Sequence, residues 1–358
     1  MRAALISLGS VSSRWTHNAM NKYFDHVDHL NIKKIQISLG TKTPTVLYEG
    51  KPVEQYDCIY AKGSFRYSDV LGALRNIYRD SAYMPISSTA FAVGHDKVLS
   101  QIEMQRYSIP MPVTYLSSSV KAAKEILEQI TYPIIMKLPK GTQGKGVMFA
   151  ESYASASSLL DTLTALRQPF LIQEFVDTSG EDIRAIVVGD KVVAAMRRVA
   201  KENESRANVH AGGTTQPCIL DTNTQKIAVN AAKAIGAEIC GVDILESAKG
   251  PVVIEVNLSP GLQGVTNCTN VDVSDHIAKY LYERTKQKIE GSKKQQADHI
   301  LQDAGISEPE TGKEIITNLD LRNNKILLPE LYTKITHFNE EDEVIISVKK
   351  GHLEIKGL

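Results

Sequence analysis

The chain has 358 residues, 42% of them hydrophobic and 23% charged, which is typical of a globular protein and excludes a disordered or fibrous one. Its 41 Lys and Arg balance its 41 Asp and Glu, so no overall field attracts nucleic acid or an anionic membrane, and we expect neither as a partner. This length leaves room for two or three domains.

The cysteines and the N-terminus favour a cytoplasmic protein. The four cysteines are far apart in the sequence and form no C-x-x-C pair, which disfavours a zinc site or a disulfide framework; they are Cys58, Cys218, Cys240 and Cys268. The apolar run at 3–8 is much shorter than the roughly 20 residues of a membrane helix. We therefore predict reduced thiols and a first buried strand.

Residues 1–95 predict a small α/β domain. Three short apolar runs, at 3–8, 35–39 and 57–61, alternate with stretches of helical spacing such as Val70, Leu71, Leu74 and Ile77. Such strand-helix-strand units favour a parallel sheet. A dinucleotide-binding fingerprint is disfavoured, because Gly9 is followed by Ser, Val and Ser instead of further glycines.

Residues 96–286 predict a second domain, and its part at about 110–173 resembles a flap. Helical spacing predicts helices at 97–106, 120–130 and 156–166, of which the second is capped by serines and stopped by Pro133. Two strands, 134–138 and 147–150, flank a glycine-rich turn at 141–146 and form a hairpin.

Further apolar runs in this domain predict antiparallel strands of a second sheet. The first run is 170–176, and two hairpins follow, 183–188 with 191–197 and 241–246 with 252–257. The fold class is therefore α/β (α+β), with a parallel sheet near the N-terminus and antiparallel sheets after it.

The last part of the chain changes in composition. Residues 283–299 are almost entirely polar, so they form either a solvated helix end or a linker, which we place at 287–307. Strand patterns return in 308–358, at 326–328, 344–348 and 353–355, and predict a small β-rich domain.

The first cluster with chemical potential is a glycine loop between two strands. It contains Gly141, Gln143, Gly144, Lys145 and Gly146 and follows Lys137. Glycines let backbone N–H groups approach phosphate oxygens, and the lysines supply positive charge. The loop leads into a strand, unlike a Walker loop, which opens a helix. Taken alone, an ordinary tight turn is the more common interpretation.

The second cluster is a set of oxygen-bearing side chains on two paired strands. Glu255 and Asn257 are two positions apart and so share one face of a strand, and Asp243 is on the strand before it. Few protein oxygens, with room left for phosphate oxygens, suit magnesium. The alternative is that these polar residues cap the loop at 258–261.

The third cluster is basic. Arg197, Arg198, Lys201 and Arg206 lead to Asn208, and Arg184 is a further candidate of the same kind. Guanidinium groups bind phosphates and carboxylates with paired hydrogen bonds. The alternative is a solvated surface.

In their order along the chain, these motifs resemble the RimK-type amino acid ligases of the ATP-grasp superfamily. The resemblance spans roughly 85–285; its motifs are GTQGKG, QEFV, EDIR, RRVAKENESRANVHAGG, GVDIL and EVNLSPGLQG. It implies an ATP-grasp fold, with a pre-ATP-grasp domain at 1–95 and a nucleotide-clamping domain at 96–286.

The resemblance also implies residue roles. Lys97, Lys137 and the glycine loop contact the ATP phosphates; Glu174, Phe175 and Val176 bind the adenine, and Asp182 lies by the ribose. Arg206, Ala207 and Asn208 line the nucleotide and acceptor side, where Arg184 and Lys201 assist catalysis. The metal ligands implied are Asp243, Glu255 and Asn257, for magnesium or alternatively manganese.

The implied activity is ATP-dependent joining of a carboxylate and an amine through an acyl phosphate, with L-glutamate added to a protein, a carrier protein or a cofactor. Two alternatives remain at this stage: a dipeptide-forming ATP-grasp ligase, and a nucleotide-sensing regulator. Look-alikes are commonly dimers or tetramers, which implies a homo-oligomer.

The tail at 308–358 lies outside this resemblance and loosely resembles one half of an AbrB-type swapped-hairpin domain. Its ten acidic residues exceed its seven Lys and Arg, which argues against a phosphate-binding surface. We therefore expect a dimerisation or partner-docking module.

Overall fold

The computed structural model describes most of the chain; the described residues are 1–40, 42–139, 146–200, 213–303, 320–322, 325–327, 344–349 and 352–357. It divides into two compact units, Met1–Gln295 and Gln296–Leu358. Each unit is described by itself.

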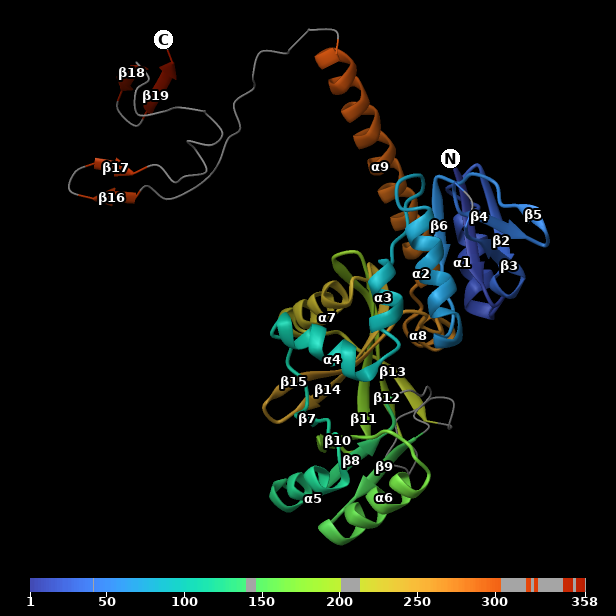
Figure 1. The fold of residues 1–358 in the computed structure, drawn as a ribbon, viewed down its shortest axis with the longest axis vertical. Coiled ribbons are helices and arrows are strands. Elements are labelled where there is room, and N and C mark those ends of the chain that lie inside the picture. The colour runs from blue at the N-terminus through green and yellow to red at the C-terminus, as the bar shows by residue number, and fades with distance from the viewer. Residues whose placement is uncertain are drawn as a thin grey trace. The chain divides into compact units, whose positions relative to one another are not determined.

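The N-terminal part contains a parallel sheet of three strands in the order β2-β1-β6, which confirms the predicted parallel sheet (Figure 1). The strands are β1 (Arg2–Ser7), β2 (His26–Asn31) and β6 (Cys58–Ala61), and the accompanying helices are α1 (Val11–Met20) and α2 (Ser68–Ile77). Strand β1 lies in the centre and buries every residue after Arg2, as its continuous apolar run requires.

One predicted strand of this sheet is misplaced. The run at 35–39 forms β3 (Ile35–Ser38), which belongs to a separate antiparallel sheet with β4 (Thr45–Tyr48) and β5 (Lys51–Pro52). The place beside β1 belongs to β2, which the sequence did not predict. In β2 only Val27 and Leu30 are buried, and their spacing does not show the alternation of a strand.

The centre of the molecule is an antiparallel sheet of five strands in the order β13-β12-β11-β14-β15. Its strands are β11 (Glu181–Val188), β12 (Lys191–Val199), β13 (Thr214–Pro217), β14 (Ile239–Ser247) and β15 (Gly250–Asn257). Both predicted hairpins are confirmed. Helix α7 (Thr222–Ile235) packs against this sheet, and α4 (Lys97–Arg106), α3 (Ser88–Val93) and α8 (Gln263–Thr269) complete its surroundings (Figure 1).

A separate lobe carries the predicted flap. Its sheet has the order β7-β10-β8-β9 and packs against α5 and α6, seen in green at the bottom of Figure 1. The elements are β7 (Thr114–Tyr115), α5 (Val120–Gln129), β8 (Ile134–Lys137), β9 (Val147–Ala150), α6 (Tyr153–Ala165) and β10 (Leu171–Glu174). Ser119 caps α5 as predicted, whereas α6 begins earlier than predicted because Ser152 forms a capping box with Ser155.

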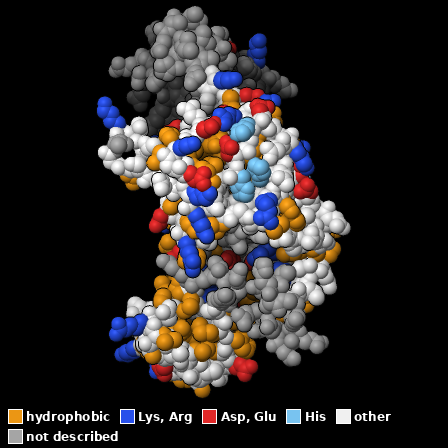
Figure 2. Space-filling view, turned by 90° about the vertical axis from the view of Figure 1, so that its right-hand side faces the viewer, with side chains coloured by type: hydrophobic (Ala, Val, Ile, Leu, Met, Phe, Trp, Pro, Cys, Tyr) orange, Lys and Arg blue, Asp and Glu red, His pale blue; other side chains and the backbone are white. Residues whose placement is uncertain are grey.

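The run at 170–176 was predicted in the sheet of the two hairpins, and this is wrong. It forms β10, which pairs with β7 and β8 in the flap lobe. An apolar pattern shows that a strand is buried but does not select its partner. The lobe also exposes apolar side chains, including Phe149, Tyr153 and Leu166, and Figure 2 shows hydrophobic side chains gathered on it.

The polar stretch at 283–299 is helical, so the helix-end interpretation is correct and a linker is absent as far as Asp303. It forms the second half of α9 (Val273–Asp303), and the division between the two units falls within it. The described tail residues form two antiparallel hairpins: β16 (Asp320–Arg322) with β17 (Lys325–Leu327), and β18 (Val344–Lys349) with β19 (His352–Gly357). Two short 3-10 helices, Ile32–Lys34 and Phe65–Tyr67, complete the elements.

The four cysteines carry free thiols, as predicted. Among the described residues, no helix is both long enough and apolar enough to cross a membrane.

Candidate active site

A cavity of about 810 Å³ lies between the central sheet, the flap lobe and the N-terminal parallel sheet. The cavity is large enough for a nucleotide together with a small substrate. It brings together eleven residues that the sequence proposed for the site: Lys97, Lys137, Glu174, Phe175, Val176, Asp182, Arg184, Arg198, Asp243, Glu255 and Asn257.

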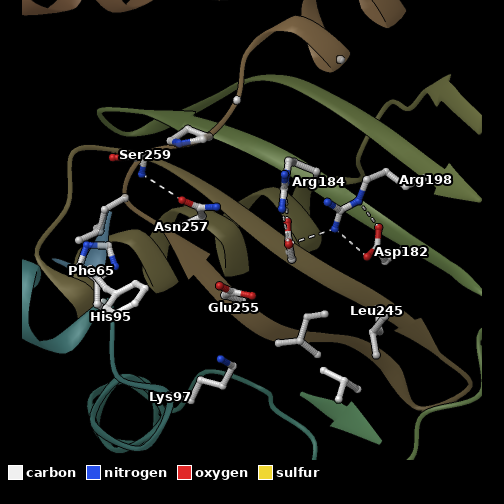
Figure 3. A pocket seen from close by; sticks show the side chains of 18 of the residues that line it. Phe65, His95, Lys97, Asp182, Arg184, Arg198, Leu245, Glu255, Asn257 and Ser259 are labelled. Carbon is white, nitrogen blue, oxygen red and sulfur yellow. Dashed lines mark hydrogen bonds and ion pairs between the residues drawn. The ribbon is translucent and has the colours of Figure 1, made fainter. Parts of the chain in front are cut away.

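A row of charged side chains crosses the central sheet at the floor of the cavity. We call this row the charged ladder; it consists of Arg198, Asp182, Arg184, Asp243 and Glu255, on strands β12, β11, β14 and β15 (Figure 3). Arg184 donates to both oxygens of Asp243, at 2.7 and 2.6 Å. Arg198 donates to both oxygens of Asp182, at 2.5 and 2.6 Å, and contacts Asp243 at 3.0 Å.

These contacts keep Asp243 ionised. Burial raises the pKa of this carboxyl, but the nearby guanidinium groups of Arg184 and Arg198 lower it further, so its pKa lies below the usual value. Burial also lowers the pKa of Arg198, and the charges of Asp243 and Asp182 more than reverse that effect. Asp243 is therefore a buried anion that already has two positive partners.

Glu255 forms no such paired hydrogen bonds among the described residues. It lies opposite Asp243 in the β14–β15 register, directly after a bulge at Ile254, and its side chain reaches the cavity. Among the described residues, its carboxylate accepts no hydrogen bond, and Figure 3 shows it facing the ammonium group of Lys97. Desolvation in the cavity floor and the charge of Asp243 raise the pKa of Glu255, and the positive charges of Lys97, Arg184 and Lys137 reverse only part of that effect.

Asn257 fits both interpretations of the sequence, a side chain of the site and a cap of the loop at 258–261. It shares the cavity with Glu255, while Val256 between them is buried in the core, as the strand alternation predicts. Its Oδ1 accepts a hydrogen bond from the backbone N–H of Ser259 at 3.0 Å, so it also caps the loop that follows β15. Its amide and the Glu255 carboxylate thus border the same space.

These residues fit a magnesium ion. Among the described residues, no three His, Cys, Asp or Glu side chains lie close enough to hold a metal, which disfavours a zinc-type site. Magnesium needs only one or two carboxylates, because phosphate oxygens and water complete its octahedron. The charge of Asp243 disfavours ionisation of Glu255, so a cation added between these two carboxylates would relieve their repulsion.

The opposite wall of the cavity is positive. Lys137 is buried, with 7% of its surface exposed, and its Nζ donates to Oε1 of Gln173 at 2.8 Å. Gln173 in turn donates to Oγ1 of Thr114 at 2.7 Å, which fixes the direction of its carbonyl. Burial, together with the charge of Lys97, lowers the pKa of Lys137 to about 8. Two ammonium groups held this close favour a multiply charged anion such as a triphosphate.

Gly146, Glu174 and Phe175 make local contacts that the structure describes, whereas other predicted residues lie outside the described part of the chain. Gly146 closes the β8–β9 hairpin with φ of +79°, and a Cβ there would lie 2.9 Å from Leu138. Glu174 pairs with the backbone of Val113, and Phe175 packs edge-to-face on Phe149 with ring centres 5.2 Å apart. Eight predicted residues lie outside the described residues: Gly141, Gln143, Gly144, Lys145, Lys201, Arg206, Ala207 and Asn208.

Among the cavity residues to which the sequence assigned no role are Gln173, Ser259 and Lys62. Gln173 orients Lys137, and Ser259 donates to the backbone carbonyl of Gly63 at 3.0 Å. Lys62 lines the cavity directly after strand β6. Only Lys62 had a recognisable signal, since ligands bind beyond the carboxyl ends of parallel strands.

The fold is that of ATP-grasp proteins. PsnB, an ATP-grasp ligase solved with a minimal precursor, Mg and ADP, matches with a TM-score of 0.61 at 18% identity, over 80% of this chain and 98% of PsnB. A RimK domain ATP-grasp protein from Sphaerobacter thermophilus matches with a TM-score of 0.61 at 19% identity, over 78% of this chain and 99% of that protein. At these identities the likeness concerns the fold.

Sequence comparison is more specific. The profile of the RimK-like ATP-grasp domain matches residues 94–281. A probable alpha-L-glutamate ligase from Cellvibrio japonicus is 34% identical over 291 residues, covering 80% of this chain and 97% of that protein. One from Thioalkalivibrio sulfidiphilus is 35% identical over the same shares. The chain belongs to the RimK-like ATP-grasp family.

This membership confirms the predicted fold and the predicted class of enzyme, an ADP-forming ligase that joins a carboxylate to an amine. It also confirms the predicted cofactors, ATP and magnesium.

Proposed function

We propose that this ligase adds L-glutamate to an acceptor carboxylate through an acyl phosphate. The observation that carries the proposal is that Lys97 and Lys137 line the same cavity as the carboxylates of Glu255 and Asp243, which repel each other. A cation placed against the carboxylates and a triphosphate placed against the lysines would balance these charges. The names of the curated relatives, probable alpha-L-glutamate ligases, support glutamate as the amino acid.

Glu255 and Asn257 would hold the magnesium ion, with Asp243 as the third ligand. Bound there, magnesium would neutralise charge on the phosphate oxygens of ATP. Asp243 keeps one guanidinium on each side, so the metal site and the arginines share one carboxylate. This arrangement would place positive charge from the arginines beside the transferring phosphoryl group.

The first chemical step forms the acyl phosphate. An acceptor carboxylate oxygen attacks the γ-phosphorus of ATP, the bond to the bridging oxygen breaks, and ADP leaves with that electron pair. Lys137 and Lys97 would hold phosphate oxygens, and Arg184 would stabilise the charge that develops on the equatorial oxygens. Lys201, Arg206 and Asn208, on the basic segment that follows β12, are proposed to contact the same groups.

The second step forms the amide bond. The amine of glutamate attacks the acyl carbon, phosphate leaves, and the nitrogen loses a proton. An acyl phosphate hydrolyses readily, so the flap hairpin β8–β9 must exclude water while the amine arrives. The adenine would lie against Glu174, Phe175 and Val176 where the flap lobe joins the central sheet, with Asp182 by the ribose.

The acceptor is proposed to be the end of a protein or peptide. Two ATP-grasp proteins of similar fold, PsnB and the macrocyclase MdnC from Microcystis aeruginosa, are solved with precursor peptides.

Incubation with ATP, magnesium, a cell extract and one labelled amino acid at a time tests the proposal. We expect label from L-glutamate in a product that mass spectrometry identifies, with ADP release that needs both glutamate and extract. If only a different amino acid labels a product, or if ADP release needs neither glutamate nor extract, the assignment as a glutamate ligase would be contradicted.

A further inference from the structure

The N-terminal parallel sheet contributes one wall of the cavity, and this wall has no assigned role. It consists of the carboxyl ends of β1 and β6 and the beginning of helix α1. Its lining residues include Ser7, Ser10, Ser13 and Lys62. In sheets of this kind, ligands bind at the carboxyl ends of the strands.

Lys62 is an unusual side chain for such a place. Only 5% of its surface is exposed, and within the described residues its ammonium group makes no hydrogen bond and no ion pair. Its Nζ lies over the face of the Tyr60 ring, 5.5 Å from the ring centre. Burial lowers the pKa of Lys62 to about 8, so the group still carries its charge at neutral pH. A buried charge without a counter-charge is costly, and such groups are normally paired.

Further basic groups lie on this side of the cavity. Burial and then the charges of His17, Lys62 and Arg14 lower the pKa of His29, so Lys62 and Arg14 both lie within electrostatic reach of His29. His29 hydrogen-bonds through Nε2 to Ser7 Oγ at 2.8 Å, and Arg14 donates to the carbonyl of Gly9 at 2.8 Å. These bonds fix the basic groups without supplying a negative charge.

Helix α1 begins at the same wall. Ser10 caps the helix by accepting from the backbone N–H of Ser13 at 3.2 Å, and the two serine hydroxyls lie 3.0 Å apart. Ser12 accepts from the backbone N–H of Leu262 at 2.9 Å, which fastens the first turn of α1 to the loop after β15. The amino end of a helix of ten residues carries a partial positive charge and attracts anions.

We propose that Lys62 and the amino end of α1 form a subsite that binds a non-reacting carboxylate of the acidic amino-acid substrate. This proposal rests on the proposed function. The amine of glutamate attacks, so both carboxylates of glutamate remain unreacted, and each needs a positive partner apart from the groups that bind ATP.

The alternative occupant, a phosphate of ATP, is disfavoured by position. The two lysines proposed for the phosphates come from α4 and β8, whereas Lys62 comes from the N-terminal sheet. Figure 3 shows Phe65, which follows Lys62 closely in the chain, beside His95 and Ser259, at the end of the cavity away from Asp182 and Arg198. The carboxylate subsite therefore lies on the side where Ser259 bonds to Gly63.

Binding measurements on the full chain test the subsite without relying on turnover. The probes are glutarate and L-glutamate, followed by saturation-transfer NMR with Mg²⁺ and AMPPNP present, and AMPPNP alone, followed by calorimetry. The variant is Lys62→Met, which keeps the length of the side chain. The matched control is Lys33→Met, which removes an exposed lysine from the same part of the molecule.

We expect Lys62→Met to weaken glutarate and glutamate binding by about tenfold or more, because a charge-assisted bond is lost. AMPPNP should bind as in the wild type, and Lys33→Met should change nothing. The melting temperature should stay equal or rise, because an unpaired buried charge has been removed. A lysine with only a structural role would lower it.

Unchanged glutarate binding in Lys62→Met overturns the subsite, as does a wild type that binds no glutarate. If Lys62→Met weakens AMPPNP binding and leaves glutarate binding unchanged, Lys62 binds a phosphate of ATP, and the proposed carboxylate subsite is also overturned. If glutarate binding depends on Lys62 but ADP release does not depend on glutamate, the subsite stands and the glutamate assignment falls. If ADP release depends on glutamate while glutarate binding does not depend on Lys62, the proposed function stands and the subsite is overturned.

Discussion

At the scale of single residues, Asp243 has the most connected position in the site. It is buried and is the shared partner of Arg184 and Arg198. Removing one member of such a group leaves buried charges without compensation, which costs about 3–5 kcal/mol. Its role is therefore structural as well as chemical.

We predict that Asp243→Asn lowers the free energy of unfolding by about 3 kcal/mol or more, measured by urea denaturation. Asp190→Asn is the control, since Asp190 is exposed in the turn between β11 and β12. Equal midpoints for the two variants would contradict the structural role of Asp243.

Lys137 gives the site a pH dependence. Its pKa of about 8 in the free protein should rise when a triphosphate binds, because nearby negative charge favours the protonated form. Below about pH 8 the lysine is protonated in both states, so ATP affinity should not depend on it. Above that pH the free protein loses the proton, and binding must take one up again.

The KM for ATP should therefore rise above about pH 8, by up to about tenfold per pH unit. Lys137→Arg should lack this rise, because arginine stays charged throughout. A rise of the same size in both proteins would assign the titration to another group.

At the scale of elements, the flap hairpin depends on Gly146. Its φ of +79° disfavours any side chain, and a Cβ would also press against Leu138. Gly50 has the same φ of +79° but nothing within 4 Å of the position of a Cβ, and it is remote from the cavity. Comparing substitutions at Gly50 and Gly146 therefore separates the effect of backbone strain, which both positions share, from the effect of the contact with Leu138.

Gly146→Ala and Gly50→Ala should each lose about 1–2 kcal/mol of stability through strain. Only Gly146→Ala should also raise the KM for ATP, because its side chain displaces Leu138 beside Lys137. Steady-state ADP formation measures this, and an equal KM in both variants would show that hairpin geometry does not affect nucleotide binding.

The elements also show what could be predicted from sequence. The β14–β15 hairpin was predictable because alternation and a short turn fix its register, and this placed Asp243 opposite Glu255. Strand β2 was not, because polar residues interrupt its alternation. The partner of β10 was not predictable either, since a buried strand fits several sheets.

Within the site, residue types could be predicted but their pairing could not. The arginine contacts of Asp243 require β11 to lie on the other side of β14, which no local pattern specifies. Lys62 had a signal in its position directly after a strand of the parallel sheet, but this position alone did not show that the lysine lines the cavity.

At the scale of the whole molecule, the ligase and the tail are separate units. The family match ends at residue 281, before the tail. The tail's described strands form only two-stranded hairpins, which are marginally stable alone, and Ile345 and Ile346 are 52% and 57% exposed. We propose that the tail is covered by a second copy of the chain.

A chain ending at Asp303 should keep the kcat and the KM for ATP of the full chain, and light scattering should report a smaller assembly. Loss of activity with an unchanged assembly size would mean that the tail serves the active site instead.

The whole account depends on a metal held at the floor of the cavity by Glu255 with its neighbours. The most direct measurement is Mn²⁺ binding in the presence of AMPPNP, followed by electron paramagnetic resonance, for the wild type and Glu255→Gln. We predict that the variant binds Mn²⁺ at least about tenfold more weakly and forms no ADP, while its melting temperature does not fall. Equal Mn²⁺ affinity in the two proteins would contradict the metal site and the mechanism built on it.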